Sequence, residues 1–295
     1  MKKNLKKFGK VIENPLLKDY TTYKIGGPCK YMVYPDNVEK LVELIKYIKL
    51  ENIKYKIIGK GSNLIFDDNG YDGIIIKLDE FDNLKIDRNI VTVGSGYNMM
   101  RLASKISRSG LSGLEFACGI PGTVGGCVFM NAGAYNSDMG YIVKTVTVLD
   151  DNLNIKVLSN KEMNFHYRTS FLKENPEYIC LEVCLKLTLG DKEDMLDIIK
   201  DRKERRLASQ PLEYPSAGSV FRNPVNNYAG KLVEDIGYKG KRYGDIEVSL
   251  KHANFIVNKG LGTSKDLIRL ISEIQDKVKD KYNIDLLLEQ EIVKY

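Results

Sequence analysis

The stretch Glu115-Phe-Ala-Cys-Gly-Ile-Pro-Gly-Thr-Val-Gly-Gly-Cys-Val-Phe-Met-Asn-Ala-Gly-Ala134 decides how the rest of the chain is interpreted. It holds five glycines and one proline between Gly119 and Gly133. Glycines at this density allow positive φ and close approach of another group, and successive N–H groups in such a turn can hold an anion. No Gly-Lys-Ser/Thr follows, and the spacing is not G-x-G-x-x-G. The stretch alone is therefore compatible with a tight turn or with a phosphate cradle.

A second glycine-rich stretch, Gly59-Lys-Gly-Ser-Asn-Leu64, follows a strand-like run at residues 55–58. It offers small residues, main-chain donors and the polar side chains of Ser62 and Asn63. Two candidate phosphate cradles in one domain favour a dinucleotide whose diphosphate contacts both.

Length and composition describe an ordinary globular protein. The 295 residues are too many for one ordinary core, and 43% hydrophobic with 28% charged residues is a typical soluble composition. The net charge of +6 suits an anionic substrate without identifying one. The lysines near the amino end are interpreted as a solvated helix face, so no nucleic-acid partner is predicted.

Other segment types are not expected. No apolar run approaches the about 20 residues of a membrane span, and no signal-peptide core follows the first lysines, which predicts a cytoplasmic protein without membrane insertion. With two histidines and no Cys-x-x-Cys, no metal site is predicted.

Hydrophobic periodicity predicts an α+β protein. Helices are expected at residues 36–51, 98–109, 191–206 and 228–236. A last helix is expected after Ser264 as its N-cap, and its predicted inward residues are Leu267, Ile268, Ile271, Ile274 and Val278. Strands are expected at residues 31–34, 55–58, 73–78, 90–93, 144–149, 155–158, 178–189, 254–257 and 286–294. We therefore expect a βαβ lobe at 1–58, a second α+β lobe at 59–189, and a separate α+β domain at 190–295.

Several motifs together resemble those of the UDP-N-acetylenolpyruvoylglucosamine reductases, in order and over nearly the whole chain. The matching segments are Thr21-Thr-Tyr-Lys-Ile-Gly-Gly27, Gly59-Lys-Gly-Ser-Asn-Leu64, Gly119-Ile-Pro-Gly-Thr-Val-Gly-Gly126, Met130-Asn-Ala-Gly-Ala134, Tyr167-Arg-Thr-Ser170, Pro215-Ser-Ala-Gly-Ser-Val-Phe-Arg-Asn-Pro224 and Leu288-Glu-Gln-Glu-Ile292. The resemblance implies a two-lobed FAD-binding domain of the p-cresol-methylhydroxylase type, followed by a substrate-binding domain.

The resemblance also implies the cofactors. FAD is expected to contact Ile25, Gly26, Gly27, Gly59, Lys60, Gly61, Ser62, Asn63, Leu64, Gly119, Pro121, Gly122, Thr123, Gly125, Gly126, Asn131 and Ala132. NADPH is the implied reductant. The absence of a Rossmann motif argues against a dedicated NADPH domain. The resemblance implies instead that NADPH and the substrate use the same cleft in turn.

The implied reaction converts UDP-N-acetylglucosamine enolpyruvate to UDP-N-acetylmuramate in peptidoglycan precursor synthesis. Hydride passes from reduced FAD N5 to the vinyl carbon, and a proton is added to the neighbouring carbon. The resemblance assigns Arg168 to the enolate carboxylate, which a guanidinium binds bidentately. It assigns Ser219 as the proton donor, with Ser216 as the competitor. Glu291 is the third catalytic candidate, although Glu289 shares its strand face and only the motif register separates them.

The UDP-sugar is expected to contact Arg206, Asn223, Lys231, His252 and Asn254, by the same resemblance. Lys239 and Lys241 are further candidates for its diphosphate, and His252 is equally compatible with a structural role. Only a short link joins Arg168 to the strand expected from residue 178, so the chain resembles members without a tyrosine-bearing insertion.

Two other functions are compatible with parts of the sequence. An FAD-dependent oxidase of the same fold often tethers its flavin through histidine, but no histidine precedes His166. A non-catalytic UDP-sugar-binding module would not need Arg168, Ser219 and Glu291 together. The oligomeric state is left open.

Overall fold

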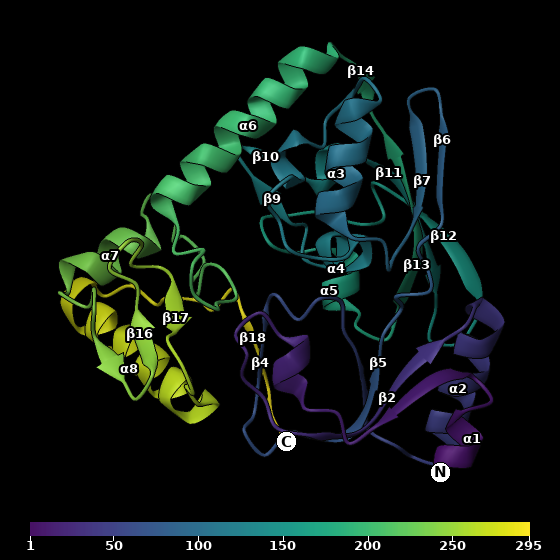
Figure 1. Ribbon diagram of the computed structural model, residues 1–295, viewed down its shortest axis with the longest axis horizontal. Helices are drawn as coiled ribbons and strands as arrows, with labels where there is room; N and C mark the ends of the chain where they lie inside the picture. Colours follow the sequence, from purple (N-terminus) through teal and green to yellow (C-terminus); the bar gives the residue numbers. More distant parts are fainter. The chain divides into compact units, whose positions relative to one another are not determined.

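The computed structural model describes residues 1–295 and contains two compact units (Figure 1). Unit 1 comprises Met1–Val11, Val33–Lys60 and Ile75–Glu204, and unit 2 comprises Ile12–Met32, Gly61–Ile74 and Arg205–Tyr295. The two lobes expected at 1–58 and 59–189 and the domain expected at 190–295 divide the chain at other positions, and these three divisions stay predictions.

One sheet has four strands, and in three of them the chain passes from one unit to the other. Its order is β1-β2-β5-β3, and the passages fall within β1, β2 and β5. These strands are β1 (Gly9–Glu13), β2 (Cys29–Pro35), β3 (Tyr55–Ile57) and β5 (Tyr71–Ile76).

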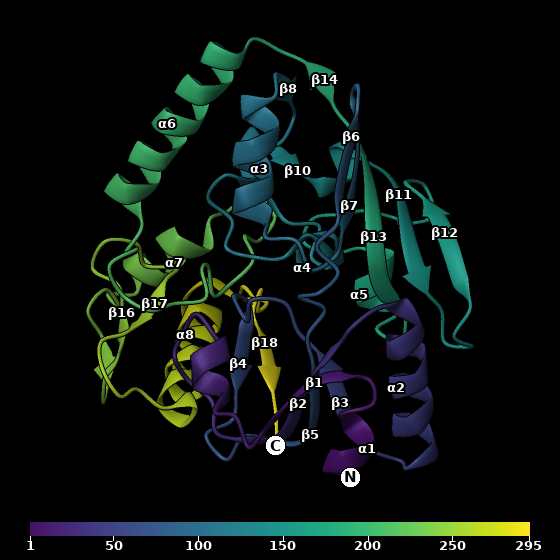
Figure 2. The same cartoon turned by 45° about the vertical axis from the view of Figure 1, so that its right-hand side comes forward.

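Unit 1 contains an antiparallel five-stranded sheet of order β12-β11-β13-β7-β6 (Figure 2). Its strands are β6 (Leu84–Asp87), β7 (Ile90–Gly94), β11 (Val143–Leu149), β12 (Ile155–Ser159) and β13 (Ile179–Lys186). Val183 lies opposite both Val93 and Val146, so the three β-branched side chains form a row across the sheet. All three are fully buried, and such cross-strand pairs stabilise a sheet.

The helix α3 (Met99–Arg108) buries its apolar residues in the same core as this row and confirms the helix expected at 98–109. Asn98 caps it by accepting from the Arg101 N–H at 2.9 Å.

The remaining elements of unit 1 are α1 (Lys2–Leu5), α2 (Val38–Leu50), β8 (Leu111–Ser112), η2 (Glu115–Ala117), α4 (Val124–Phe129), β9 (Gly133–Ala134), β10 (Ser137–Asp138), η3 (Met139–Tyr141), α5 (Phe171–Glu174) and β14 (Thr188–Leu189). The helix α6 (Lys192–Ser209) begins in unit 1 and ends in unit 2.

The short helix α4 lies inside the glycine-rich stretch and was not expected from the sequence. Thr123 caps it by accepting from the Gly126 N–H at 3.3 Å. Its two adjacent glycines disfavour a helix interior by about 1 kcal/mol each, and the sequence therefore did not predict this helix. Val124, Cys127 and Val128 follow the i, i+3, i+4 spacing and are buried in the unit 1 core, and this burial stabilises the helix.

Unit 2 gathers distant segments around the long helix α8 (Ser264–Tyr282). Its other elements are η1 (Leu17–Tyr20), β4 (Leu64–Phe66), α7 (Ala229–Asp235), β15 (Arg242–Tyr243), β16 (Ile246–Val248), β17 (Ile256–Asn258) and β18 (Glu291–Val293). The strands β15, β16 and β17 form an antiparallel sheet, and β18 pairs with β4 in parallel (Figure 1). None of the helices of either unit combines the length and the apolar character that crossing a bilayer requires.

Two details of α8 differ from the sequence-based prediction. The N-cap is Thr263, not Ser264, because the Thr263 hydroxyl accepts from the Asp266 N–H at 3.0 Å. Ser264 is instead the first helical residue, and its N–H donates to the carboxylate of Asp68, 196 residues earlier in the chain. Leu270 is buried where Ile268 was expected to be, since Ile268 lies beside the inward stripe and is half-buried.

We expect Thr263→Ala to lower the free energy of unfolding by about 1 kcal/mol, because the Asp266 N–H loses its acceptor. Thr263→Ser keeps a hydroxyl and serves as the matched control. Urea unfolding followed by circular dichroism measures both variants. Equal stability of Thr263→Ala and the parent protein would show that Thr263 is not the cap.

Candidate functional site

The segment that carries Ser219 lies between two other segments of unit 2. On one side the Glu289 N–H donates to Val220 O and the Arg222 N–H donates to Leu287 O, both at 2.9 Å. On the other side the Val220 N–H donates to the main-chain oxygen of Asn254 at 2.9 Å. Regular strand begins only at β18, so the strand expected from residue 286 is shorter than predicted. Ser219 is thus bonded into place by segments far away in the sequence.

Asn254 holds this segment with its side chain as well. The residue is 4% exposed, its Oδ1 accepts from the Phe221 N–H at 3.0 Å, and its Nδ2 donates to Phe221 O at 2.9 Å. Both ends of the amide are therefore engaged with the main chain two residues after Ser219. These contacts favour a positioning role, and its predicted contact with the UDP-sugar stays a prediction.

The parallel pairing of β18 with β4 determines where Glu291 lies. Glu291 is in register with Leu64, and its N–H donates to Asn63 O at 2.9 Å. The Asn63 amide donates in turn to Glu289 O at 3.0 Å. The Glu291 side chain is exposed, whereas Glu289 is half-buried. The structure thus places the third catalytic candidate beside two residues that were predicted to contact FAD.

The Thr21–Gly27 motif packs closely against the same unit. A Cβ on Gly27 would lie 2.2 Å from Asp68 O, so no larger residue fits there. The Thr22 N–H donates to Gly61 O at 3.3 Å. The Thr22 hydroxyl is buried and has no hydrogen-bond partner. Because buried polar atoms are nearly always satisfied, an unpaired hydroxyl next to the Gly61–Leu64 stretch fits a bound polar ligand such as FAD.

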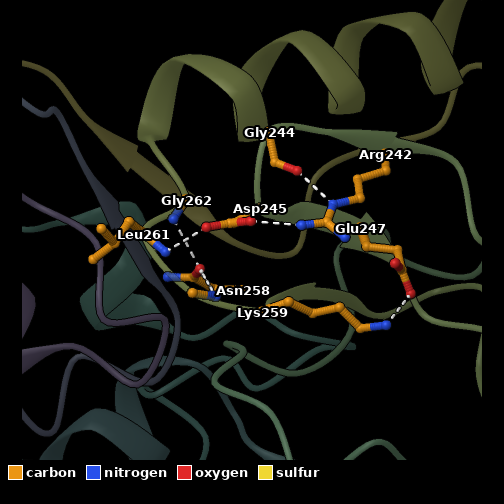
Figure 3. Close-up of polar contacts among 9 residues, drawn as sticks. Arg242, Gly244, Asp245, Glu247, Asn258, Lys259, Leu261 and Gly262 are labelled. Carbon is orange, nitrogen blue, oxygen red and sulfur yellow. Dashed lines mark hydrogen bonds and ion pairs between the residues drawn. The ribbon is translucent and has the colours of Figure 1, made fainter.

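Side chains close the loop between β17 and α8 (Figure 3), and one of them also anchors the centre of this motif. The Asn258 amide donates to Tyr23 O at 3.0 Å, and its Oδ1 accepts from the N–H groups of Gly260 and Gly262. Asp245 accepts from the Leu261 N–H at 2.8 Å and pairs with Arg242. The loop is therefore closed by side chains and holds the Tyr23 main chain in turn.

In unit 1 the two glycine-rich stretches touch each other. A Cβ on Gly59 would lie 2.6 Å from the Thr123 hydroxyl, so this close approach requires glycine. The Lys77 ammonium donates to Gly59 O at 2.6 Å and lies 3.3 Å from the Asp79 carboxylate. Lys77 is 4% exposed, and burial lowers the pKa of its ammonium while Asp79 opposes that shift. A cation next to Gly59, which itself lies against Thr123, fits the diphosphate of FAD.

Lys77 was missed from the sequence because Gly73-Ile-Ile-Ile-Lys-Leu78 was interpreted only as a strand. A lysine is rarely fully buried without a partner, so a single lysine within such an apolar run was the available signal. Ser95 was missed as well, since nothing in its neighbourhood resembled a motif. Its buried hydroxyl has no partner, and its main-chain oxygen accepts from the Gly125 N–H at 2.8 Å.

Arg168 occupies a tight turn of unit 1. His166 and Thr169 exchange two main-chain hydrogen bonds of 3.0 Å, and Arg168 between them has φ of 57°. This left-handed conformation is usually left to glycine, and it costs a residue with a side chain some backbone strain. The Arg168 guanidinium donates to Gly133 O at 3.0 Å, and the buried Asn131 amide donates to His166 O at 2.8 Å. The turn is thus tied to the Met130–Ala134 motif.

The remaining substrate candidates all belong to unit 2. Arg206 donates to the Gln210 side chain at 3.0 Å, Lys231 is exposed on α7, and Asn223 accepts from the Ala229 N–H at the start of that helix. His252 is half-buried, and its Nδ1 accepts from the Asn254 N–H at 3.2 Å. Burial lowers the pKa of the His252 imidazole, which favours a neutral ring.

Comparison with known proteins agrees with these motifs. Residues 210–293 match the family model of the UDP-N-acetylenolpyruvoylglucosamine reductase C-terminal domain, and residues 29–157 match that of an FAD binding domain. The UDP-N-acetylenolpyruvoylglucosamine reductase of Bacillus licheniformis is 46% identical over 97% of this chain and 94% of its own length. The chain belongs to the UDP-N-acetylenolpyruvoylglucosamine reductase family.

Other members of this reductase family also match this chain over almost its whole length. The Clostridium tetani reductase is 42% identical over 95% of this chain and 91% of its own length. The crystal structure of UDP-N-acetylenolpyruvylglucosamine reductase from Thermus caldophilus has a TM-score of 0.81 at 36% identity, covering 96% of this chain and 98% of that one. The expected fold class is thereby confirmed: an α+β protein with an FAD-binding domain of the p-cresol-methylhydroxylase type and the C-terminal domain of the reductases.

We expect Arg168→Gly to be more stable than Arg168→Ala by about 0.5–1 kcal/mol, because only glycine adopts φ of this sign without strain. Urea unfolding of the two purified variants measures the difference. The neighbouring pair Tyr167→Gly and Tyr167→Ala is the control, since Tyr167 does not share the left-handed φ and its alanine variant should be the more stable. The same order at both positions would contradict strain at Arg168.

Proposed function

We propose that the protein is an FAD-dependent reductase that uses NADPH to convert UDP-N-acetylglucosamine enolpyruvate to UDP-N-acetylmuramate, in peptidoglycan precursor synthesis. Family membership over almost the whole chain supports the reaction class. The observation that carries the proposal is the register of β18, which puts Glu291 beside Asn63 while the adjoining residues 287–289 hold the Ser219 segment. Bound FAD would supply the hydride, from N5 to the vinyl carbon of the substrate.

The Gly59–Leu64 and Gly119–Gly126 stretches would hold the diphosphate of FAD. Main-chain N–H groups in such turns bind phosphate oxygens without a net charge of their own. Lys77 adds a buried positive charge under Gly59, and the unpaired Thr22 hydroxyl offers a further donor. The structure thus contains donors and charge of the kind that this cofactor requires.

Arg168 would bind the carboxylate of the enolpyruvyl group and stabilise the negative charge that develops next to it. A guanidinium stays protonated and offers paired donors, so it can contact both carboxylate oxygens. Its turn is tied to Gly133 and Asn131, so little reorganisation is needed when the charge appears.

Ser219 would donate the proton to the carbon next to the vinyl terminus. An isolated serine hydroxyl is a poor acid, so the developing carbanion must supply the driving force. Glu291 would share the acid role in this step and help to stabilise the enolate. We also propose that the protein acts in the cytoplasm. Charged UDP-sugars and NADPH cross the hydrocarbon core of a membrane only at a high free-energy cost, so the enzyme is expected in the compartment that holds them.

Anaerobic stopped-flow absorbance of the flavin band tests the proposal. NADPH should bleach the band, and the enolpyruvyl UDP-sugar should restore it in the absence of oxygen. Recovery with oxygen alone would instead identify an oxidase. A protein that binds the UDP-sugar but cannot be loaded with FAD would be a binding module.

The second half-reaction should identify the catalytic residues. We expect Ser219→Ala to slow reoxidation by the substrate by roughly 10²–10⁴-fold, the usual contribution of a general acid, without slowing reduction by NADPH. Arg168→Lys should slow the same step by about 10–100-fold, because the bidentate contact is lost. Ser216→Ala is the matched control and should reoxidise normally. A slow Ser216→Ala variant with a normal Ser219→Ala variant would reverse the assignment.

A further inference from the structure

Gln290 lies in the middle of the C-terminal segment, between the two glutamates that strand periodicity alone does not separate. Alternation along an extended chain directs it away from the face of Glu291, and it is 4% exposed. Its main chain is fixed on both sides, because Glu289 O and the Glu291 N–H both bind Asn63. The side chain that reaches inward from this segment is therefore Gln290.

The Gln290 amide contacts the main chain directly before Ser219. Its Nε2 donates to Ala217 O at 3.1 Å and to Gly218 O at 3.2 Å. Its Oε1 accepts from the Tyr23 hydroxyl at 3.1 Å, and Tyr23 is fully buried. One side chain thus connects three of the family motifs, those at residues 21–27, 215–224 and 288–292.

The orientation of this amide is determined by its partners. The two carbonyl oxygens can only accept, so they require the NH₂ end, and the phenol must then donate to the oxygen end. Burial raises the pKa of the Tyr23 phenol well above its usual value, so the phenol keeps its proton at ordinary pH. The Asn258 amide donates to Tyr23 O at 3.0 Å, which fixes the main chain of Tyr23 as well.

The residue before Ser219 needs such external support. Gly218 has φ of 75°, and nothing lies within 4 Å of the position that its Cβ would take. Glycine has access to many backbone conformations, and no side chain of its own restrains it here, so Gly218 by itself does not determine the direction of the Ser219 hydroxyl. The two hydrogen bonds from Gln290 restrain the peptide groups on either side of that glycine.

We propose that Gln290 is a positioning residue for the proton donor: it fixes the Ala217–Gly218 turn so that the Ser219 hydroxyl is held in the direction that protonation requires. This inference rests on the proposed role of Ser219. A misplacement of about 1 Å in a reacting group costs about 100-fold in rate, so the expected effect is on the proton-transfer step. Reduction of the flavin by NADPH does not need Ser219 and should be unaffected.

The test is anaerobic stopped-flow kinetics of the flavin-loaded Gln290→Leu variant. We expect its maximal rate of reoxidation by the enolpyruvyl UDP-sugar to fall by roughly 10–100-fold, with a larger solvent deuterium isotope effect and unchanged reduction by NADPH. Gln275→Leu is the matched control, because Gln275 donates to Leu286 O at 2.8 Å in the same chain region but not to the Ser219 turn. Reoxidation of Gln290→Leu at the rate of Gln275→Leu would overturn the proposal.

Two further variants keep the outcome clear. If Gln290→Leu does not fold, Tyr23→Phe removes only the hydroxyl that holds Oε1 of the amide. It should slow reoxidation while leaving reduction unchanged, and normal reoxidation of Tyr23→Phe would then overturn the proposal. Ser219→Ala separates the two inferences: normal reoxidation of that variant would refute the proposed role of Ser219, whereas a slow Ser219→Ala with a normal Gln290→Leu refutes only the role of Gln290.

Gln290→Glu adds a readout from pH. A carboxylate at this position would face two carbonyl oxygens with no proton to donate, so its pKa should be raised in the folded state. A group with a raised acid pKa destabilises the fold as pH rises through the acid range toward neutrality. We therefore expect the Tm of Gln290→Glu, relative to Gln290→Leu, to fall as pH rises. A pH-independent difference would contradict the two donated hydrogen bonds.

Discussion

The candidate site of unit 2 depends on the hydrogen bonding of the C-terminal segment to two partners. Residues 287–289 bind the Ser219 segment, and Glu291–Val293 pair with β4 directly after the Gly59–Asn63 loop. Strands this short are not stable alone. They persist because the buried apolar side chains of α8, such as Leu267 and Ile271, form the core with Ile65 and Phe221 from the same segments. The reactive groups are therefore arranged by packing beneath them.

Single amide side chains join the loops that no ladder of hydrogen bonds connects. Asn254 binds both main-chain groups of Phe221, Asn258 binds Tyr23 O and two loop N–H groups, and Gln290 binds two carbonyls and a phenol. An amide suits this role because it donates and accepts at one site. Each such bond contributes about 1 kcal/mol net, but a buried partner left unpaired costs about 1–3 kcal/mol. These contacts therefore specify loop geometry more than they raise stability.

Unit 1 departs from local sequence preferences at positions that we propose to bind FAD or the substrate. Arg168 adopts a left-handed φ, Lys77 is a buried cation, and the first turn of α4 contains two glycines. Each departure has a local cost that the surrounding contacts offset: Arg168 binds Gly133 O, Lys77 binds Gly59 O, and α4 buries Val124 and Val128. Conflicts of this kind between local propensity and fold are expected where a chain serves a ligand rather than its own stability.

The sequence by itself determined the family, the α+β class and most elements, since these rest on motifs and on periodic apolar residues such as those of α3. It did not reveal that Thr263 rather than Ser264 caps α8, because the Asp68 carboxylate that binds Ser264 is distant in the chain. Strand periodicity did not separate Glu289 from Glu291, and only the motif register favoured Glu291. The sequence did not single out Gln290 or Lys77. Only the tertiary structure revealed the cap of α8 and the contacts of Gln290 and Lys77, because the partners of these side chains lie far apart in sequence and meet only in the packed fold.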